Sequence, residues 1–268
     1  MFFLTTLLAT ASAANLYVCA SGCDSTTIQG AIDASSDGDK VWIAAGTYSE
    51  QLTVDHHVFL LAQSSSMNTV VVEGDGTDTL LEVTADGFAQ VRRIDFTDGG
   101  GDAAIINDGE LRLVKSHIYG NEGVFGAIMN YGTMWIRVNS VVSGNATTSY
   151  FAGGITSVGD LQVDDCTFLG NDGYNGGAIA NIGGDLDVDD SSFTANDGYL
   201  GGAIHNSLGA AVISDSSFST NYADSLGGAW SNHNLGGTVT VSGSGYAANS
   251  TGSGSYEDCY DVNGGCTP

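Results

Sequence analysis

The chain has 268 residues, of which 39 are glycine and one is proline, and 42% are hydrophobic; this composition excludes collagen and proline-rich disordered linkers and favours short strands joined by tight turns. Six lysines and arginines stand against 31 aspartates and glutamates, giving a formal net charge of -25, and no Lys or Arg follows Arg137. Such a surface repels phosphate backbones and anionic membranes, so nucleic acid is excluded as a partner, whereas neutral glycans, cationic surfaces and divalent metals remain open.

Residues 1–13 have the features of a secretory signal peptide. An apolar run over residues 2–9 is followed by Ala11, Ser12 and Ala13, a small-residue cleavage pattern. The alternative is a short buried N-terminal segment. No later run approaches the roughly 20 apolar residues of a membrane-spanning helix. We therefore expect a secreted protein or one at the outer cell surface, with no transmembrane span.

Residues 14–35 are expected to cap the N-terminal end of the fold. Residues 26–34 form a short amphipathic pattern, with Thr26 or Thr27 as the N-cap of a helix. Cysteines lie close together in two places, Cys19 with Cys23 and Cys259 with Cys266. We expect two local disulfides formed in an oxidising compartment. A zinc site fits the count of four, but the two pairs belong to opposite ends of the chain.

Residues 36–250 contain an internal repeat. An aromatic or β-branched residue stands three positions before each of six asparagines that are 24 to 28 residues apart: Asn121, Asn145, Asn171, Asn196, Asn221 and Asn249. A Gly-Gly-Ala-Ile motif or a weaker copy lies between successive asparagines. A unit of this length is stable only when it stacks on its neighbours at about 4.8 Å. The repeat predicts an all-β, right-handed, single-stranded parallel β-helix of eight or nine coils, which residues 251–268 close as a C-terminal cap or tail.

Aligned copies of the repeat predict which positions face the core. Three adjacent columns are informative: an apolar inward column (Ile128, Ile155, Ile179, Ile204, Trp230), a mixed column expected to face solvent (Met129, Thr156, Ala180, His205, Ser231), and an inward ladder rich in asparagine (Asn130, Ser157, Asn181, Asn206, Asn232). We also expect Phe168, Phe193 and Phe218 to stack inside. Cys166 occupies a column of serines and is expected to be a buried free thiol. The copy from Met134 to Asn145 holds about one residue more than the others.

These residues resemble two groups of β-helix proteins. The Gly-Gly-Ala-Ile and Phe-x-x-Asn repeats resemble those of polymorphic outer-membrane protein passengers. Residues 26–29, 38–41 and 45–48 are similar to the N-terminal part of pectate-lyase-like β-helices. Both resemblances imply a β-helix but leave the function open, because this fold supports lyases, hydrolases, epimerases and non-catalytic adhesins.

Two functions follow from these observations. The first is a non-catalytic, adhesin-like or envelope-structural protein that binds an extracellular polysaccharide or a cell-surface glycan. The alternative is a polysaccharide lyase, hydrolase or epimerase, for which a substrate-binding patch is predicted where basic residues gather: Arg92, Arg93, Asp95, Glu110, Arg112 and Arg137. Ordinary solvated ion pairs explain the same cluster. No catalytic residue is predicted.

A candidate calcium site is predicted in the acidic half of the chain. Asp165, Asp190 and Asp215 recur every 25 residues, and Asp164 and Asp189 precede two of them. On successive coils these carboxylates repel one another, and calcium accepts irregular sets of oxygen ligands. The alternative is a solvated acidic surface that salt screens. Calcium is the one cofactor that the sequence indicates.

Overall fold

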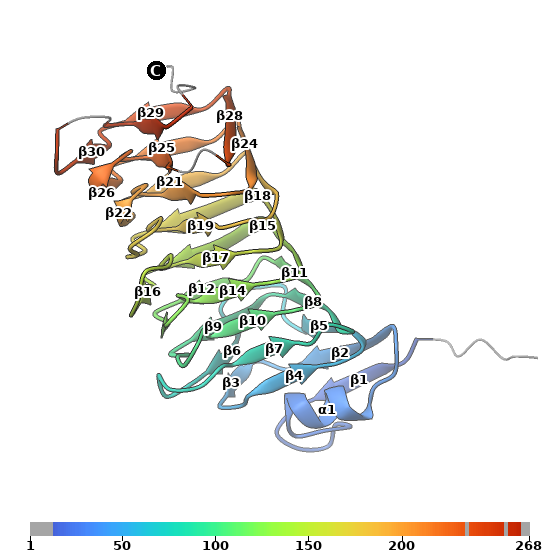
Figure 1. Cartoon of the computed structure of the whole chain (residues 1–268). Helices are drawn as coiled ribbons and strands as arrows, with labels where there is room; N and C mark the ends of the chain where they lie inside the picture. The colour runs from blue at the N-terminus through green and yellow to red at the C-terminus, as the bar shows by residue number, and fades with distance from the viewer. Residues whose placement is uncertain (1–12, 234–235, 255–256, 264–268) are drawn as a thin grey trace, which may run out of the picture.

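The computed structural model describes residues 13–233, 236–254 and 257–263, and these residues form a parallel β-helix of about ten coils with one short helix (Figure 1). The predicted fold class is therefore confirmed. The strand pairs of these residues are parallel and join successive coils, as in Leu161, Leu186 and Ala211. The predicted signal peptide lies outside the described residues, apart from Ala13.

Three faces run along the helix. Faces A1 and A2 belong to one 17-stranded sheet and meet at a sharp corner, and face B is a nine-stranded sheet. Face A1 consists of β1 (Asn15–Val18), β2 (Asp39–Ile43), β5 (His57–Ala62), β8 (Phe88–Arg92), β11 (Glu110–Val114), β20 (Leu186–Asp189), β24 (Ala210–Ser214) and β28 (Thr238–Ser242). Face A2 consists of β3 (Gly46–Tyr48), β6 (Val70–Glu73), β9 (Ile94–Thr97), β12 (His117–Tyr119), β21 (Ser192–Thr194), β25 (Ser217–Ser219) and β29 (Gly245–Ala247). Two long strands, β15 (Thr133–Ser143) and β18 (Asp160–Leu169), pass through the corner and contribute to both faces.

Face B and two small sheets complete the coils. Face B consists of β4 (Leu52–Val54), β7 (Leu81–Val83), β10 (Ile105–Asn107), β14 (Ile128–Asn130), β17 (Ile155–Ser157), β19 (Ile179–Asn181), β23 (Ile204–Asn206), β27 (Trp230–Asn232) and β31 (Cys259–Asp261). The small sheets are β13 (Glu122–Gly123) with β16 (Ala146–Thr147), and β22 (Asp197–Leu200), β26 (Tyr222–Leu226) and β30 (Ser250–Thr251). Strand β1 pairs with β2, and β31 pairs with β27. The β-structure thus extends on both sides of the predicted range 36–250.

In five coils the corner between A1 and A2 is made by one residue in the left-handed region. Arg93, Lys115, Asp165, Asp190 and Asp215 have φ between 46° and 58°, a conformation that aspartate and asparagine tolerate better than most residues. In β15 both Val138 and Asn139 have positive φ, and the register shifts between Arg137 and Ser140. This bulge accommodates the extra residue that the repeat contains.

Apolar and amide ladders fill the interior. Phe168, Phe193 and Phe218 are buried and stack nearly parallel, with ring centroids 4.8 and 4.9 Å apart, as predicted. The asparagine ladder of face B is also confirmed: Asn181 donates to Asn206 Oδ1 at 2.9 Å. Sequence reasoning missed a second buried ladder, formed by the six repeat asparagines themselves, in which Asn171 donates to Asn196 Oδ1 at 2.9 Å.

The N-terminal end is capped by α1 (Ile28–Ala34), as expected. Thr27 Oγ1 accepts a hydrogen bond from Gly30 N at 3.2 Å, and the helix buries Ile28, Ala31 and Ile32 against the first coil. A disulfide joins Cys19 to Cys23 in the same region. At the other end Cys259 is disulfide-bonded, and its predicted partner Cys266 lies outside the described residues.

One column of face B differs from the prediction. Met129, Thr156, Ala180, His205 and Ser231 were expected to face solvent, but all five are buried. The cause is the glycine-rich turn before each strand, which lies against the outer surface of face B. A Cβ atom on Gly201, for example, would lie 2.1 Å from Ile204 O and 3.0 Å from Ser231 Oγ. The glycines of the Gly-Gly-Ala-Ile motif are therefore required for this close approach.

Candidate functional site

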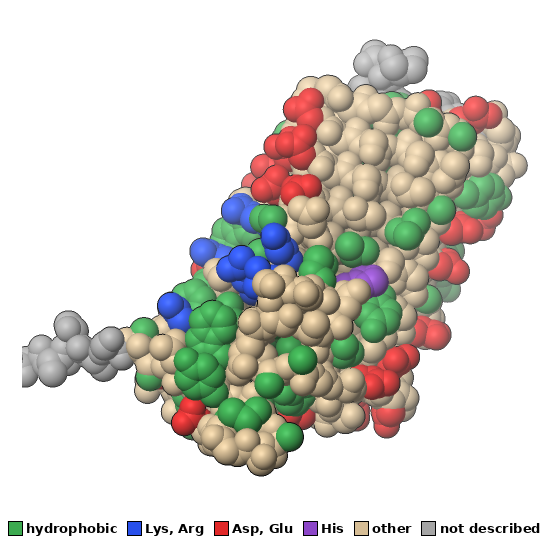
Figure 2. Space-filling view, turned by 180° about the vertical axis from the view of Figure 1, so that it is seen from behind, with side chains coloured by type: hydrophobic (Ala, Val, Ile, Leu, Met, Phe, Trp, Pro, Cys, Tyr) green, Lys and Arg blue, Asp and Glu red, His purple; other side chains and the backbone are tan. Residues whose placement is uncertain are grey.

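The Lys and Arg side chains gather along face A1. Strand register places Lys40, Phe59, Gln90, Arg112 and Trp135 in one outward column on successive coils. The neighbouring column contains Arg92, Val114 and Arg137, and the corner column contains Arg93 and Lys115. Figure 2 shows these cations as one group on the flank of the molecule, beside hydrophobic side chains. We call Phe59, Phe88, Arg92, Arg93, Arg112, Lys115, Trp135 and Arg137 the basic–aromatic patch.

Arg112 is the centre of this patch. Its guanidinium carbon lies 5.1 Å from the ring centroid of Phe88 and 4.8 Å from that of Trp135, within the range of cation–π attraction. Glu110 accepts a hydrogen bond from Arg112 Nη2 at 2.6 Å. Two aromatic rings and one carboxylate thus hold the guanidinium group in place on the exposed surface of the sheet.

The other predicted arginines are partly inserted between their neighbours. The Nε atoms of Arg92, Arg93 and Arg137 are buried and have no hydrogen-bond partner in the described part of the chain. Arg137 Nη2 donates to Gln162 Oε1 at 2.9 Å. Arg112 and Arg137 lie on adjacent coils, where Arg112 is opposite Trp135 and Arg137 is opposite Val114.

Asp95, which the sequence grouped with these basic residues, lies on face A2, on the other side of the corner from Arg112. Its side chain is 1% exposed, and Oδ1 accepts a hydrogen bond from His117 N at 3.0 Å. Burial raises the pKa of Asp95 to about 6. The structure therefore separates Asp95 from the surface that Arg112 and Arg137 share.

A histidine–serine pair beside Asp95 was missed by sequence reasoning. His117 Nε2 lies 2.7 Å from Ser143 Oγ, a distance at which an imidazole can accept a hydroxyl proton. Burial lowers the pKa of His117. Ser143 follows His117 by 26 residues. This separation is close to the repeat length of about 25 residues, which is the sequence feature that could have indicated that the two side chains lie side by side. Among the described hydrogen bonds, the second ring nitrogen of His117 has no carboxylate partner.

The predicted acidic ladder lies further along face A1. Ligand oxygens of Asp164, Asp189 and Asp190 lie within 4.8 Å of one another. Asp165 and Asp215 occupy the corner column on the coils before and after Asp190. Repulsion from Asp189, with smaller effects of desolvation and of the neighbouring aspartates, raises the pKa of Asp190. These carboxylates are the residues that could hold calcium.

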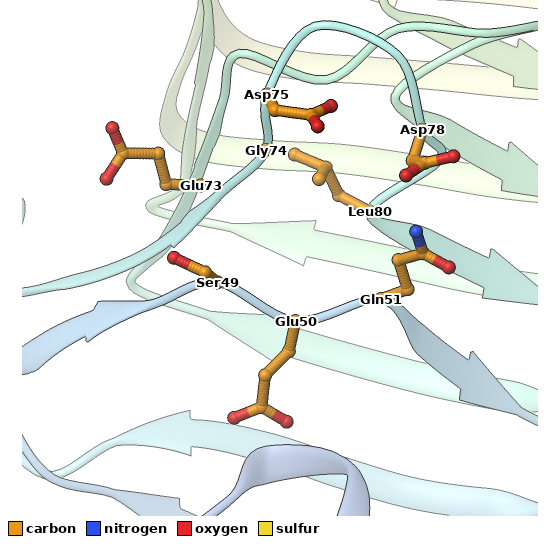
Figure 3. Close-up of a pocket in the computed structure, with 8 residues that line it drawn as sticks. All are labelled: Ser49, Glu50, Gln51, Glu73, Gly74, Asp75, Asp78 and Leu80. Carbon is orange, nitrogen blue, oxygen red and sulfur yellow. The ribbon is translucent and has the colours of Figure 1, made fainter.

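A cavity of about 490 Å³ opens near the N-terminal end (Figure 3). Acidic side chains line it, including Glu73, Asp75 and Asp78. Glu50 comes from the same wall but points toward α1, where its carboxylate accepts hydrogen bonds from Ile28 N and Gln29 N at 2.9 Å each. Glu50 therefore stabilises the start of the capping helix and is not available to a ligand.

No family model matches this chain, and no curated protein matches it. Solved structures do match it. Pectin methylesterase from carrot is 12% identical over 95% of this chain and 90% of that chain, with a TM-score of 0.54, and pectin methylesterase from Aspergillus niger is 16% identical over 96% of this chain and 91% of that chain, with a TM-score of 0.53. Alginate lyase from Paenibacillus sp. str. FPU-7 is 12% identical over 92% of this chain and 98% of that chain, with a TM-score of 0.50. At these identities the similarity shows the parallel β-helix fold alone. No helix of the described residues has the length and hydropathy of a membrane span.

Proposed function

We propose that this protein is a non-catalytic, secreted or cell-surface β-helix, adhesin-like in role, whose basic–aromatic patch binds an acidic polysaccharide. The observation that carries this proposal is the distribution of charge. All six Lys and Arg residues of a chain with net charge -25 lie on face A1 or at its corner. Guanidinium groups bind carboxylate and sulfate groups through paired hydrogen bonds, and Trp135 beside them offers a flat apolar surface.

The overall negative charge is compatible with an acidic ligand at this patch. Exposed charges more than about 8 Å apart are largely screened at physiological ionic strength. The acidic ladder begins at Asp164, one coil beyond Arg137, and within the patch Glu110 is paired with Arg112. Arg92 lies three coils from Asp164, so the acidic ladder is largely screened there.

Two carboxylates bear on catalysis. Cleavage by β-elimination needs an accessible base beside the cations that neutralise the sugar carboxylate. Glu110 is bonded to Arg112 at 2.6 Å, and Asp95 is buried on the adjoining face. This arrangement favours binding without cleavage. The alternative is a polysaccharide lyase, hydrolase or epimerase, because structural neighbours named pectin methylesterase and alginate lyase act on such polymers.

The test is retention of the protein on a panel of immobilised acidic and neutral polysaccharides, with product absorbance followed in parallel. We expect retention on acidic polymers without product, and a loss of about tenfold in affinity for Arg112→Gln and for Trp135→Ala, equivalent to about 1.4 kcal/mol. Gln51→Glu is the matched control for Arg112→Gln. It makes the net charge more negative by the same single unit, but at a position next to face B and away from the patch. Product formation would establish the enzymatic alternative, and equal retention of Arg112→Gln and the control would exclude the patch.

A further inference from the structure

Face A1 has a cationic half and an anionic half. Strands β8, β11 and β15 carry the cations Arg92, Arg112 and Arg137, whereas β18 and β20 carry the carboxylates Asp164, Asp187 and Asp189. The corner column changes sign in the same order: Arg93, Lys115, Asn139, Asp165, Asp190, Asp215. Figure 2 shows the acidic group on the same flank as the basic group, nearer the C-terminal end. Opposite charges thus lie on the two sides of the boundary between β15 and β18.

We propose that two copies of this chain pair through face A1 as an antiparallel dimer. The two-fold axis lies in the interface, parallel to the strands, between β15 and β18. Rotation about such an axis reverses the direction of the coil stack and leaves each position along the strand unchanged. Strand β15 then faces β18 of the second copy, β11 faces β20, and β8 faces β24. A two-fold interface of this kind is self-complementary.

The strand register gives the residues that meet. Four of the five cations of the patch face a carboxylate of the second copy: Arg137 faces Asp164, Arg112 faces Asp187, Lys115 faces Asp190, and Arg93 faces Asp215, whereas Arg92 faces Ser214. Each pair occurs twice because of the symmetry. The uncharged positions of the same column also face one another: Val212, which is 46% exposed, faces Gln90, and Trp135 faces Gln162.

Other registers are less favourable. An axis on β15 places Arg137 against itself, and an axis on β18 places Asp164 against itself. In the chosen register the like-charge contact is between Glu110 and Asp185, and Glu110 is already neutralised by Arg112 of its own chain at 2.6 Å. Asp189 and Asp165 face the uncharged Val114 and Asn139 of the second copy, and the carboxylates of the other faces lie outside the interface, where salt screens them. Of these three registers, charge matching favours the axis between β15 and β18.

This pairing uses the same cations as the proposed glycan site, but it does not depend on that proposal. The test is sedimentation velocity of the full chain without polysaccharide, in chelator, at about 0.15 M and about 1 M salt. We expect a dimer at the lower salt concentration that dissociates at the higher one. Arg137→Glu and Asp164→Lys should each weaken the dimer at least tenfold, because each creates two like-charge contacts.

Mixing the two variants gives the decisive result. In a mixed dimer both contacts between positions 137 and 164 again join opposite charges, so the mixture should dimerise although neither variant does so alone. This recovery also shows that both variants are folded. Gln51→Glu, outside the interface, should dimerise like the unmodified chain. A monomer under all conditions, or a mixture that stays monomeric while the unmodified chain dimerises, would overturn the proposal. If the protein dimerises as expected but is not retained on any polysaccharide, the proposed glycan-binding function is wrong and the dimer proposal stands.

Discussion

His205 Nδ1 lies 2.9 Å from Ser231 Oγ on the neighbouring coil, underneath a glycine-rich turn. Burial, with a smaller effect of His233, lowers the pKa of His205 to about 4. The unfolded chain has a histidine pKa of about 6.5, so it binds a proton in a range where the folded chain does not. The stability linked to His205 is therefore complete above the unfolded value and is lost as pH falls toward 4.

The first prediction concerns this acid sensitivity. Because His205 is buried in its neutral form, the unfolding free energy of the unmodified protein should fall by roughly 2 kcal/mol when the pH is lowered from about 7 to about 4.5. His205→Asn, which does not titrate, should lose less stability over the same interval, whatever its stability at neutral pH. Denaturant unfolding of both proteins at several pH values measures the difference. Parallel pH curves would show that His205 is accessible to protons in the folded chain.

The second prediction concerns Asp95. Its pKa is raised to about 6 by burial, so its ionisation favours the unfolded chain, and stability falls as pH rises from about 4 to about 6. Asp95→Asn retains an oxygen that can accept the hydrogen bond from His117 N. We expect this variant to be more stable than the unmodified protein by about 1–3 kcal/mol at about pH 8, and to lose that gain at about pH 4. An equal gain at both pH values would assign the effect to packing.

The periodic features of the fold could be predicted from the sequence, because each coil imposes the same environment on the same column. The Phe168 stack, the buried Cys166 and the extra residue in β15 all follow from aligned copies of the repeat. The environment of His205 could not be predicted in this way, since side-chain chemistry in its column varies and the turn that covers it is glycine. A missing Cβ leaves no apolar signal in the sequence.

The candidate site shows the same distinction. Aligned copies place Asp164, Asp165, Asp189, Asp190 and Asp215 together, and the structure does so as well. The basic cluster was recognised by composition, but the separation of Asp95 from Arg112 depends on where the corner at Arg93 falls. A left-handed residue carries no strong signal when it is an arginine, so the two faces could not be distinguished.

The third prediction uses the serine column around Cys166. The thiol donates to Asp164 O at 3.2 Å, as the Ser191 hydroxyl donates to Asp189 O at 2.8 Å, and burial raises the pKa of Cys166 to about 12. Cys166→Ser should therefore change the unfolding free energy by less than about 1 kcal/mol. In the native protein the thiol should resist alkylation until denaturant is added. Rapid native labelling, detected by mass spectrometry, would contradict the buried position.

The fourth prediction concerns the aromatic stack. Phe193 lies between Phe168 and Phe218 and is fully buried, so Phe193→Ala should cost about 3–5 kcal/mol of unfolding free energy. Leu169→Ala is the control, because Leu169 is 45% exposed on the outer side of the same strand as Phe168. Its cost should stay below about 1 kcal/mol. Similar costs for the two variants would mean that the interior does not depend on this stack.

The last prediction concerns calcium binding at the acidic ladder. Oxygens of Asp164, Asp189 and Asp190 lie within 4.8 Å of one another, and Asp189 Oδ1 also accepts a hydrogen bond from Ser214 at 2.6 Å. Repulsion raises the pKa of Asp190, and a divalent cation would relieve that repulsion through carboxylate ligands.

We expect millimolar calcium to raise the melting temperature of dilute, monomeric protein, and Asp190→Asn to shrink that increase. Asp86→Asn removes the same charge from an exposed turn away from the ladder and should leave the calcium effect unchanged. Magnesium is the second control, because it requires stricter octahedral geometry than this irregular group of oxygens offers. A melting temperature independent of calcium, or an equal loss of the effect in both aspartate variants, would reduce the ladder to an acidic surface whose repulsion is relieved by salt alone.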